Sequence, residues 1–251
     1  MVHVVSVHSF RGGTGKSNIT ANVAVQVAQR GRRVGVIDTD IQSPGIHVLF
    51  GLTGAGVSGA LNDYLFRGHP IRDVAHDVTP AGVDGRIHLI PSSVKPGEIS
   101  RVLREGYDAQ QLVQGLRGLV DALDLDVLLI DTHPGLGEET LLSLVISDTS
   151  LMVLRPDHQD YEGTGVLVDV ARSLDVPRKA LVVNKVPAAM DADSVRHQVE
   201  RTYRSRVVGV LAHEDAMMAL GSGDIFTLRH PGHPLTAALA GVSTFVLDPA
   251  R

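Results

Sequence analysis

The feature that most constrains this chain is a glycine-rich turn placed between a strand-like segment and a helix-like segment. Residues 2–7 are rich in valine, as expected of a strand buried on both faces of a parallel sheet. Residues 16–30 have the apolar spacing of a helix, and Gly31 stands where the helix should end. A second strand-like segment follows at residues 34–37. Together these segments predict a βαβ unit with a right-handed crossover.

The same alternation of strands and helices continues along the chain. Further strands are predicted at residues 87–91, 126–130, 151–154, 179–183 and 207–211. Helices are predicted at residues 99–104, 109–123, 138–146, 164–174, 192–203 and 214–220, and a loop at residues 51–59. This order is typical of an α/β fold with a doubly wound, mostly parallel sheet flanked by helices. With 251 residues, 43% of them hydrophobic, one domain spanning residues 1–251 is expected.

The composition excludes several classes of function. The chain has no cysteine, which excludes disulfides, thiolate metal sites and iron–sulfur ligation by this chain, and is compatible with a reducing cytoplasm. Its net charge of −5 provides no general attraction to nucleic acid or anionic lipid. The apolar N-terminal segment has no basic leader and is interrupted by glycine well short of a membrane-spanning length, so no signal peptide is expected.

The glycine-rich turn has the chemistry of a phosphate-binding loop. Its glycines allow backbone N–H groups to surround phosphate oxygens, the helix N-terminus adds partial positive charge, and Lys16 adds a full charge. Ser17 is expected to offer its hydroxyl to Mg²⁺. Phe10 occupies the position of the first glycine in the pattern G-x-x-x-x-G-K-[ST], so the strand and helix around the turn carry the prediction. The predicted binding residues are Gly12, Gly13, Thr14, Gly15, Lys16, Ser17 and Asn18.

Acidic residues follow two of the predicted strands. Asp38 and Asp40 follow the second strand, and Asp131 ends the apolar segment Leu128-Leu129-Ile130. Carboxylates at the carboxyl ends of parallel strands face the ligand crevice, and one delivered by an apolar strand commonly binds the metal. Either Asp38 or Asp40 could instead cap the turn that follows its strand.

The segment from Phe10 to Ser17 resembles the deviant Walker A motif, K-G-G-x-G-K-[ST], of the MinD/ParA family of P-loop ATPases. The resemblance runs through nearly the whole chain. It implies a Rossmann-like, three-layer P-loop NTPase fold that binds ATP and Mg²⁺. It also implies a homodimer that forms when ATP is bound, slow hydrolysis stimulated by an activating protein partner, and positioning or partitioning of a cellular cargo.

The resemblance also implies roles for individual residues. Asp38 would hold the Mg²⁺ water shell, Asp40 would position the attacking water, and the Gly135 backbone N–H would face the γ-phosphate. Arg11 stands where the family usually has a signature lysine that reaches the partner subunit's phosphates, so it either acts in trans or is a solvated side chain beside the loop. His133 stands where the family often has proline, and either senses phosphate or pH or simply packs. The implied catalytic residues are Lys16, Asp40 and Arg11, and the implied metal-binding residues are Ser17, Asp38 and Asp131.

Two later segments resemble the family's base-binding site. Asn184 ends a predicted strand and would read the base edge through its amide. The aspartate that reads guanine in the N-K-x-D pattern of GTPases is replaced by Pro187, which favours ATP over GTP. Glu214 matches the segment that lines adenine, although either Glu214 or Asp215 could simply cap a helix. The pair His230 and His233 lacks acidic or thiol partners nearby in sequence, so a loop is expected there.

The surface on which such a protein would act is weakly marked. A group of arginines could contact DNA phosphates or form a solvated face: Arg196, Arg201, Arg204 and Arg206. The apolar stripe at residues 235–242 contains no lysine or arginine, so it predicts a helix packed on the sheet and no membrane-targeting helix. The alternative functions are a non-hydrolysing nucleotide-binding scaffold, and an ATP-dependent ligase or amidase, for which the chain offers no substrate domain. Iron–sulfur carrier and nitrogenase-reductase relatives are excluded by the absence of cysteine ligands.

Overall fold

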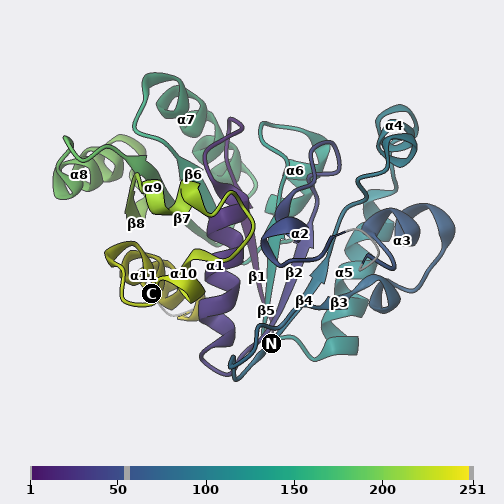
Figure 1. Ribbon diagram of the computed structural model, residues 1–251. Helices are drawn as coiled ribbons and strands as arrows, with labels where there is room; N and C mark the ends of the chain where they lie inside the picture. Colours follow the sequence, from purple (N-terminus) through teal and green to yellow (C-terminus); the bar gives the residue numbers. More distant parts are fainter. Residues whose placement is uncertain (1, 54–56, 249–251) are drawn as a thin grey trace.

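The computed structural model describes residues 2–53 and 57–248 and is built around one eight-stranded sheet (Figure 1). The strand order is β3-β4-β2-β5-β1-β6-β7-β8, and only β3 runs antiparallel to its neighbour among the strands described. This arrangement confirms the predicted doubly wound, mostly parallel sheet. The strands are β1 (His3–His8), β2 (Arg33–Asp38), β3 (His76–Asp77), β4 (Arg86–Ile90), β5 (Val127–Asp131), β6 (Thr149–Leu154), β7 (Arg178–Val186) and β8 (Arg206–Ala212).

Helices cover both faces of the sheet because alternate residues of each buried strand point to opposite faces. Side chains such as Val36 and Leu129 pack with α1, α2, α10 and α11, whereas Ile37 and Leu128 pack with helices of the other face. The helices are α1 (Lys16–Ala28), α2 (Ile46–Leu49), α3 (Leu61–Arg67), α4 (Pro96–Glu105), α5 (Ala109–Leu123), α6 (Glu138–Val145), α7 (His158–Ser173), α8 (Ala192–Tyr203), α9 (Asp215–Ala219), α10 (Phe226–Arg229) and α11 (Pro234–Leu247), with a 3₁₀ turn, η2 (Ile71–Val74).

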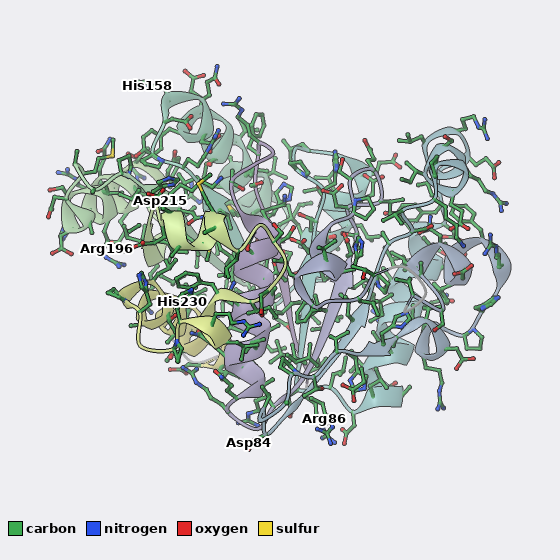
Figure 2. The ribbon with its side chains drawn as sticks, viewed as in Figure 1. Asp84, Arg86, His158, Arg196, Asp215 and His230 are labelled. Atoms are coloured by element: carbon green, nitrogen blue, oxygen red, sulfur yellow. The ribbon has the colours of Figure 1, made fainter. Side chains whose placement is uncertain are left out.

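The parallel strands bring their carboxyl ends to one edge of the sheet. Figure 2 shows Asp84, just before β4, and Arg86, its first residue, at the lower end of the molecule, and His158, which opens the helix after β6, at the upper end. In the centre of the sheet, β5 lies between β1 and β2, and Asp131 is paired in register with both Val7 and Asp38. The loops that follow β1, β2 and β5 therefore meet at the upper edge.

Several elements differ from the sequence-based expectation. The sequence patterns missed the shortest elements, among them α2, α3, α10 and β3. Helix α3 has only 7 residues, α2 and α10 have 4 each, and β3 has 2, which is too few to establish a period. Helix α7 begins at His158 and not at residue 164, because the Asp157 side chain caps its N-terminus by accepting a hydrogen bond from the Asp160 N–H at 3.0 Å. The predicted loop at 51–59 contains neither helix nor strand at residues 51–53 and 57–59, and its residues 54–56 lie outside the described part.

The C-terminal helix α11 packs against α1 and β8, as its apolar stripe predicts. Leu235, Leu239 and Val242 are at most 4% exposed and belong to the same core cluster as the apolar side of α1. Among residues 2–53 and 57–248, no helix combines the length and the apolar character that crossing a bilayer requires.

Candidate functional site

The turn between β1 and α1 is shaped to hold an anion. Gly13 and Gly15 have φ angles of 78° and 96°, which only glycine adopts readily. A Cβ at Gly15 would lie 2.4 Å from the Asn184 Nδ2 atom, so a side chain does not fit there. Helix α1 begins at Lys16 without a side-chain cap, which leaves its first N–H groups available to a ligand. The Thr14 hydroxyl is buried and has no partner among the described residues, as expected of a group that binds a ligand.

Lys16 supplies positive charge within this turn. Only 7% of the residue is exposed, and its charge partly offsets the rise that burial causes in the pKa of Asp131 at the end of β5. The Ser17 side chain, one residue further along α1, lies beside Asp131 and also opposes the rise in its pKa. The structure therefore brings together the lysine, the serine and the aspartate that the sequence predicted to bind phosphate and metal.

Two buried carboxylates lie side by side at the ends of β2 and β5. Asp38 and Asp131 are 0% and 1% exposed and are paired in register. Burial, followed by the neighbouring charge of Asp131, raises the pKa of Asp38 well above its usual value. Burial also raises the pKa of Asp131 to about 6, although Lys16 opposes this shift. Two buried carboxylates with raised pKa values are a suitable place for a divalent cation, which would neutralise them.

These residues fit Mg²⁺ better than a metal held by many protein ligands. Within the described ranges, no three His, Asp or Glu side chains are grouped in a way that could hold a metal ion by themselves. Mg²⁺ usually keeps several waters and binds one or two carboxylates together with substrate phosphates. Ser17, Asp38 and Asp131 provide a set of oxygen groups of this kind.

Asp38 and Asp40 also hold the loop that follows β2. Asp38 accepts hydrogen bonds from the backbone N–H groups of Asp40 and Gly45, at 3.0 and 3.3 Å. Asp40 accepts one from the Ser43 N–H at 3.0 Å. Both residues therefore make the hydrogen bonds of the turn-capping alternative. Both carboxylates also remain close enough to Asp131 to interact with it, since Asp131 contributes to the raised pKa of Asp38, and Asp40 contributes to that of Asp131. His133, in the loop after β5, lies against Asp40 with its Nδ1 atom 2.7 Å from the Asp40 Oδ1 atom.

The backbone of Gly135 is bonded to the phosphate-binding turn in this conformation. Its φ angle is 93°, and its N–H donates to the Ser9 carbonyl at 3.0 Å. The sequence-based expectation was that this N–H faces the γ-phosphate. The bond to Ser9 occupies it here, because the loop after β5 closes onto the end of β1. The expected contact requires this hydrogen bond to open.

Phe10 and Arg11 are both held by the first turns of α7. The Phe10 ring lies on Gly163, where a Cβ would come within 2.0 Å of it. The Arg11 guanidinium donates to the Gln159 side chain and lies 3.9 Å from an oxygen of Asp160. The Arg11 side chain is 41% exposed. Arg11 is therefore neither free in solvent nor directed by these contacts to its own phosphate-binding turn.

Residues 184 and 185, near the end of β7, hold the phosphate-binding turn from the other side. The Asn184 amide donates to the Thr14 carbonyl at 2.7 Å, and the Lys185 ammonium donates to the Gly13 carbonyl at 2.8 Å. Beside them lies a hollow of about 320 Å³ whose lining includes Asn18, Asn184, Glu214 and Met217. Glu214 occupies the N-cap position of α9 without a side-chain cap bond, which leaves its carboxylate at this hollow. The size suits a nucleotide base.

Several contributors to this site were not found in the sequence. His8 is buried behind the turn and is hydrogen-bonded to the Thr132 hydroxyl, and Thr20 donates to Asp131 at 3.3 Å. Nothing in their local pattern separates them from ordinary core residues. Gly163 lies one residue before the helix predicted at residues 164–174, so its close approach to Phe10 carried no signal in the sequence either.

The four arginines proposed for DNA are partly engaged in local structure. Arg196 donates to the Val207 carbonyl and Arg201 to the His197 carbonyl, the latter at 3.3 Å. Arg206 lies over the Phe245 ring at 5.6 Å, and Arg204 ends α8 in a left-handed conformation. In the histidine pair, the His233 ring caps α11 by accepting from the Leu235 N–H at 3.1 Å.

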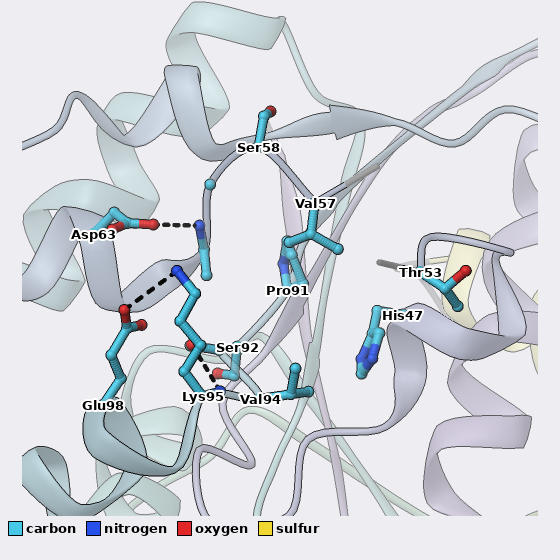
Figure 3. Close-up of a pocket in the computed structure, with 13 residues that line it drawn as sticks. His47, Thr53, Val57, Ser58, Asp63, Pro91, Ser92, Val94, Lys95 and Glu98 are labelled. Atoms are coloured by element: carbon cyan, nitrogen blue, oxygen red, sulfur yellow. Dashed lines mark hydrogen bonds and ion pairs between the residues drawn. The ribbon is translucent and has the colours of Figure 1, made fainter. Parts of the chain in front are cut away.

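A separate hollow of about 200 Å³ lies beside the end of β4 (Figure 3). Figure 3 shows Lys95 next to Glu98, with 3.5 Å between their charged atoms, and His47 on the far side of the opening. Ser92, in its wall, donates to the Asp38 carbonyl at 2.8 Å. This hollow therefore borders the loop after β2 but is not lined by the phosphate-binding turn.

Comparison with known proteins relates the chain to nucleotide-binding proteins. Residues 1–223 match the family described as ParA: NUBPL iron-transfer P-loop NTPase. An uncharacterized ATP-binding protein of Methanocaldococcus jannaschii is 26% identical over 97% of this chain and 87% of its own length. An iron–sulfur cluster carrier protein of Pyrococcus furiosus is 28% identical over 72% of this chain, and the match spans 60% of that relative.

Solved structures share the fold across the whole chain. The MinD cell division protein of Aquifex aeolicus has a TM-score of 0.81 and 17% identity, with 98% of this chain and 97% of that protein covered. MinD from Pyrococcus horikoshii, solved with Mg-ADP, has a TM-score of 0.82 and 18% identity, with 98% and 96% covered. The match to the family, together with the phosphate-binding turn and the paired carboxylates, shows that this chain belongs to the ParA family of P-loop NTPases, within the group described as NUBPL-type iron-transfer P-loop NTPases.

Proposed function

We propose that this protein is a switch ATPase that binds ATP with Mg²⁺, dimerises when ATP is bound, and hydrolyses ATP slowly until a protein partner accelerates the reaction. The observation that carries this proposal is the grouping of Lys16, Ser17, Asp38 and Asp131 around an uncapped helix N-terminus. A triphosphate brings the negative charge that Lys16 and the N–H groups would bind. A divalent cation brings the positive charge that the buried carboxylates lack.

Each residue would have a defined task. The backbone of residues 12–18 and Lys16 would hold the β- and γ-phosphates, and Ser17 with the two buried aspartates would hold Mg²⁺ or its waters. The metal neutralises charge on the phosphate oxygens when bound. Asp40, at the rim of the same group, would orient the attacking water through its carboxylate.

ATP is proposed over GTP for two reasons. Pro187 stands where the guanine-reading aspartate of GTPases belongs. A relative that matches 97% of this chain is named as an ATP-binding protein. The hollow beside Asn184, whose lining includes Lys185 and Met217, would take the base. The base would lie on the methionine with its edge toward Asn184.

The absence of cysteine bears on the cargo of the proposed switch. Named relatives include iron–sulfur cluster carriers, but these 251 residues contain no cysteine to hold a cluster by thiolates. Sequence reasoning excluded iron–sulfur carriage on this ground, yet the sequence relationship lies with that group. We therefore propose a cargo or partner held by contacts other than cysteine ligation, with DNA at the arginines of α8 and β8 as one candidate.

A non-hydrolysing scaffold is the second candidate, and two contacts favour it. The Gly135 N–H is bonded to Ser9, and Arg11 is bonded to Gln159, so neither faces the turn's ligand in this conformation. A protein locked in this conformation would bind nucleotide without cleaving it. Measured turnover distinguishes it from the switch ATPase.

The test combines binding and turnover. Titration calorimetry of Mg·ATP is expected to give clear binding by the wild type and loss of about a hundredfold or more in affinity for Lys16→Ala, because the substitution removes the charged side chain of the cradle. Phosphate release then reports hydrolysis. Undiminished ATP affinity in Lys16→Ala would show that this turn is not the nucleotide site.

A further inference from the structure

A pair of side chains joins the two loops at the centre of the site. Asp40 lies in the loop after β2 and His133 in the loop after β5, and their Oδ1 and Nδ1 atoms are 2.7 Å apart. The side chains are 14% and 29% exposed, so the contact is largely shielded from solvent. Because β2 and β5 are adjacent strands, this pair lies just beyond the paired aspartates at their ends.

The hydrogen-bond pattern determines how the Asp40 carboxylate is turned. A carboxylate oxygen only accepts, so the proton of this contact lies on His133 Nδ1. The same oxygen also accepts from the Ser43 N–H at 3.0 Å. Two donors thus hold Oδ1, and no donor among the described residues bonds Oδ2. The carboxylate therefore has one fixed oxygen and one oxygen that remains available.

We infer that His133 is a positioning residue, which orients Asp40 so that its Oδ2 atom faces the water that attacks ATP. This inference rests on the proposed ATP hydrolysis. The terminal torsion of an aspartate is broad and has no sharp preference of its own. The contact from His133 supplies the missing restraint, and it acts across two loops. Ser43 alone restrains the carboxylate only from its own loop.

The residue type at position 133 matters for this role. The ring donates through a nitrogen on a short, stiff side chain, and the partly buried surroundings strengthen the hydrogen bond. A proline at this position has no side-chain donor and would leave Oδ1 with the Ser43 N–H alone. His133 thus has a task different from phosphate sensing or simple packing.

The test separates orientation from binding. In His133→Ala, kcat for ATP hydrolysis is expected to fall about tenfold to a hundredfold, because a misplaced catalytic group costs this much. Affinity for Mg·ATP should stay within about twofold, because Lys16 and the turn are untouched. His133→Asn places an amide N–H near the position of Nδ1, so it should recover most of the rate. The matched control is His69→Ala, an exposed histidine after α3, which should behave as the wild type.

A second readout does not depend on turnover. Nitrogen NMR of the nucleotide-free wild type should show a protonated Nδ1 for His133, assigned by its disappearance in His133→Asn. A bare Nδ1 overturns the inference. Wild-type turnover that is unchanged in His133→Ala also overturns it while leaving the proposed function intact. If the wild type does not turn over ATP, the proposed hydrolysis fails and the positioning role fails with it, even where Nδ1 carries the proton.

Discussion

Arg11 is the residue whose role depends most on a second subunit. Its guanidinium is bonded to Gln159 at the start of α7, so it must exchange this contact to reach a partner's phosphates. If it does so, Arg11→Ala should lose ATP-dependent dimerisation and turnover while the monomer still binds ATP through Lys16 and the turn. Light scattering and phosphate release, with calorimetry for binding, provide the measurements.

The companion variant Arg11→Lys separates charge from geometry. It should keep dimerisation if a positive charge in trans is sufficient, and lose it if a planar, bidentate guanidinium is required. Normal dimerisation and hydrolysis in Arg11→Ala would assign Arg11 to the surface contact with α7 and refute the role in trans.

His8 makes stability depend on pH. It is 1% exposed, and burial, followed by the charge of Lys16, lowers its pKa to about 3. In the unfolded chain a histidine has a pKa of about 6.5, so on acidification the unfolded state takes up the proton first. The contribution of neutral His8 to the free energy of unfolding is therefore fully present above pH 6.5 and is lost as the pH falls toward 3.

Replacing His8 by asparagine should remove this dependence and keep a donor near Thr132. Relative to His8→Asn, the wild type should lose up to about 3 kcal/mol of unfolding free energy between pH 7 and pH 4. Urea unfolding of nucleotide-free protein at each pH measures the difference. The comparison is needed because the raised pKa of Asp131 acts in the opposite direction over this range. Parallel curves for the two proteins would contradict the prediction.

At the scale of elements, the sequence predicted those helices and strands that are long enough to show a hydrophobic period or a continuous apolar run. Helices α5 and α8 begin and end at the predicted residues, and the central strands differ by a few residues at their ends. The ends of β7 could not be predicted, since a bulge shifts the register of the strand. The start of α7 is set by the Asp157 side chain, an N-cap signal that the hydrophobic period alone does not show. Helix α3 depends on Asp63, whose carboxylate accepts a hydrogen bond from the Ala60 N–H at 2.9 Å. No recognisable sequence pattern marks this contact.

Helix α7 supports the phosphate-binding turn through one close contact. A Cβ at Gly163 would lie 2.0 Å from the Phe10 ring, so Gly163→Ala must displace Phe10 and, with it, the start of the turn. Overpacking of this kind should lower the unfolding free energy by about 1–3 kcal/mol, measured by urea denaturation, and should also weaken ATP binding.

Gly165→Ala is the matched control on the same helix. There a Cβ would meet Tyr203 at 3.8 Å, an ordinary contact, so alanine should stabilise the helix by about 0.5–1 kcal/mol. Equal effects at the two positions would show that the Phe10 contact is unimportant.

At the scale of the whole molecule, ATP is expected to convert the protein from monomer to dimer. Asp40→Ala should accumulate the dimer, because it removes the proposed water-positioning carboxylate and leaves Lys16, Ser17 and Asp131 in place. Light scattering with ATP and with ADP measures the masses. One mass under all conditions, in a wild type that hydrolyses ATP normally, would refute the switch.

The sequence indicated many of the residues that lie at the site, but it did not indicate the hydrogen bonds that these residues make with one another. Parallel strands must bring Asp38 and Asp131 to one edge, so their proximity was predictable. Which hydrogen bonds Gly135, Arg11 and His133 make depends on how separate loops close on one another, and local patterns carry no information on this. The single domain over residues 1–251 remains a prediction.

The contacts from β7 to the phosphate-binding turn have a consequence for ligands that have no base. Because Asn184 and Lys185 hold the carbonyls of Thr14 and Gly13, they set the shape of the turn before any nucleotide arrives. Asn184→Ala should therefore weaken the binding of inorganic triphosphate, measured by calorimetry, as well as that of ATP. A variant that binds triphosphate normally and only ATP poorly would show that Asn184 serves base recognition alone. If binding of both ligands weakens, a substitution at the end of β7 cannot change the preference for a purine without also changing the affinity for phosphate.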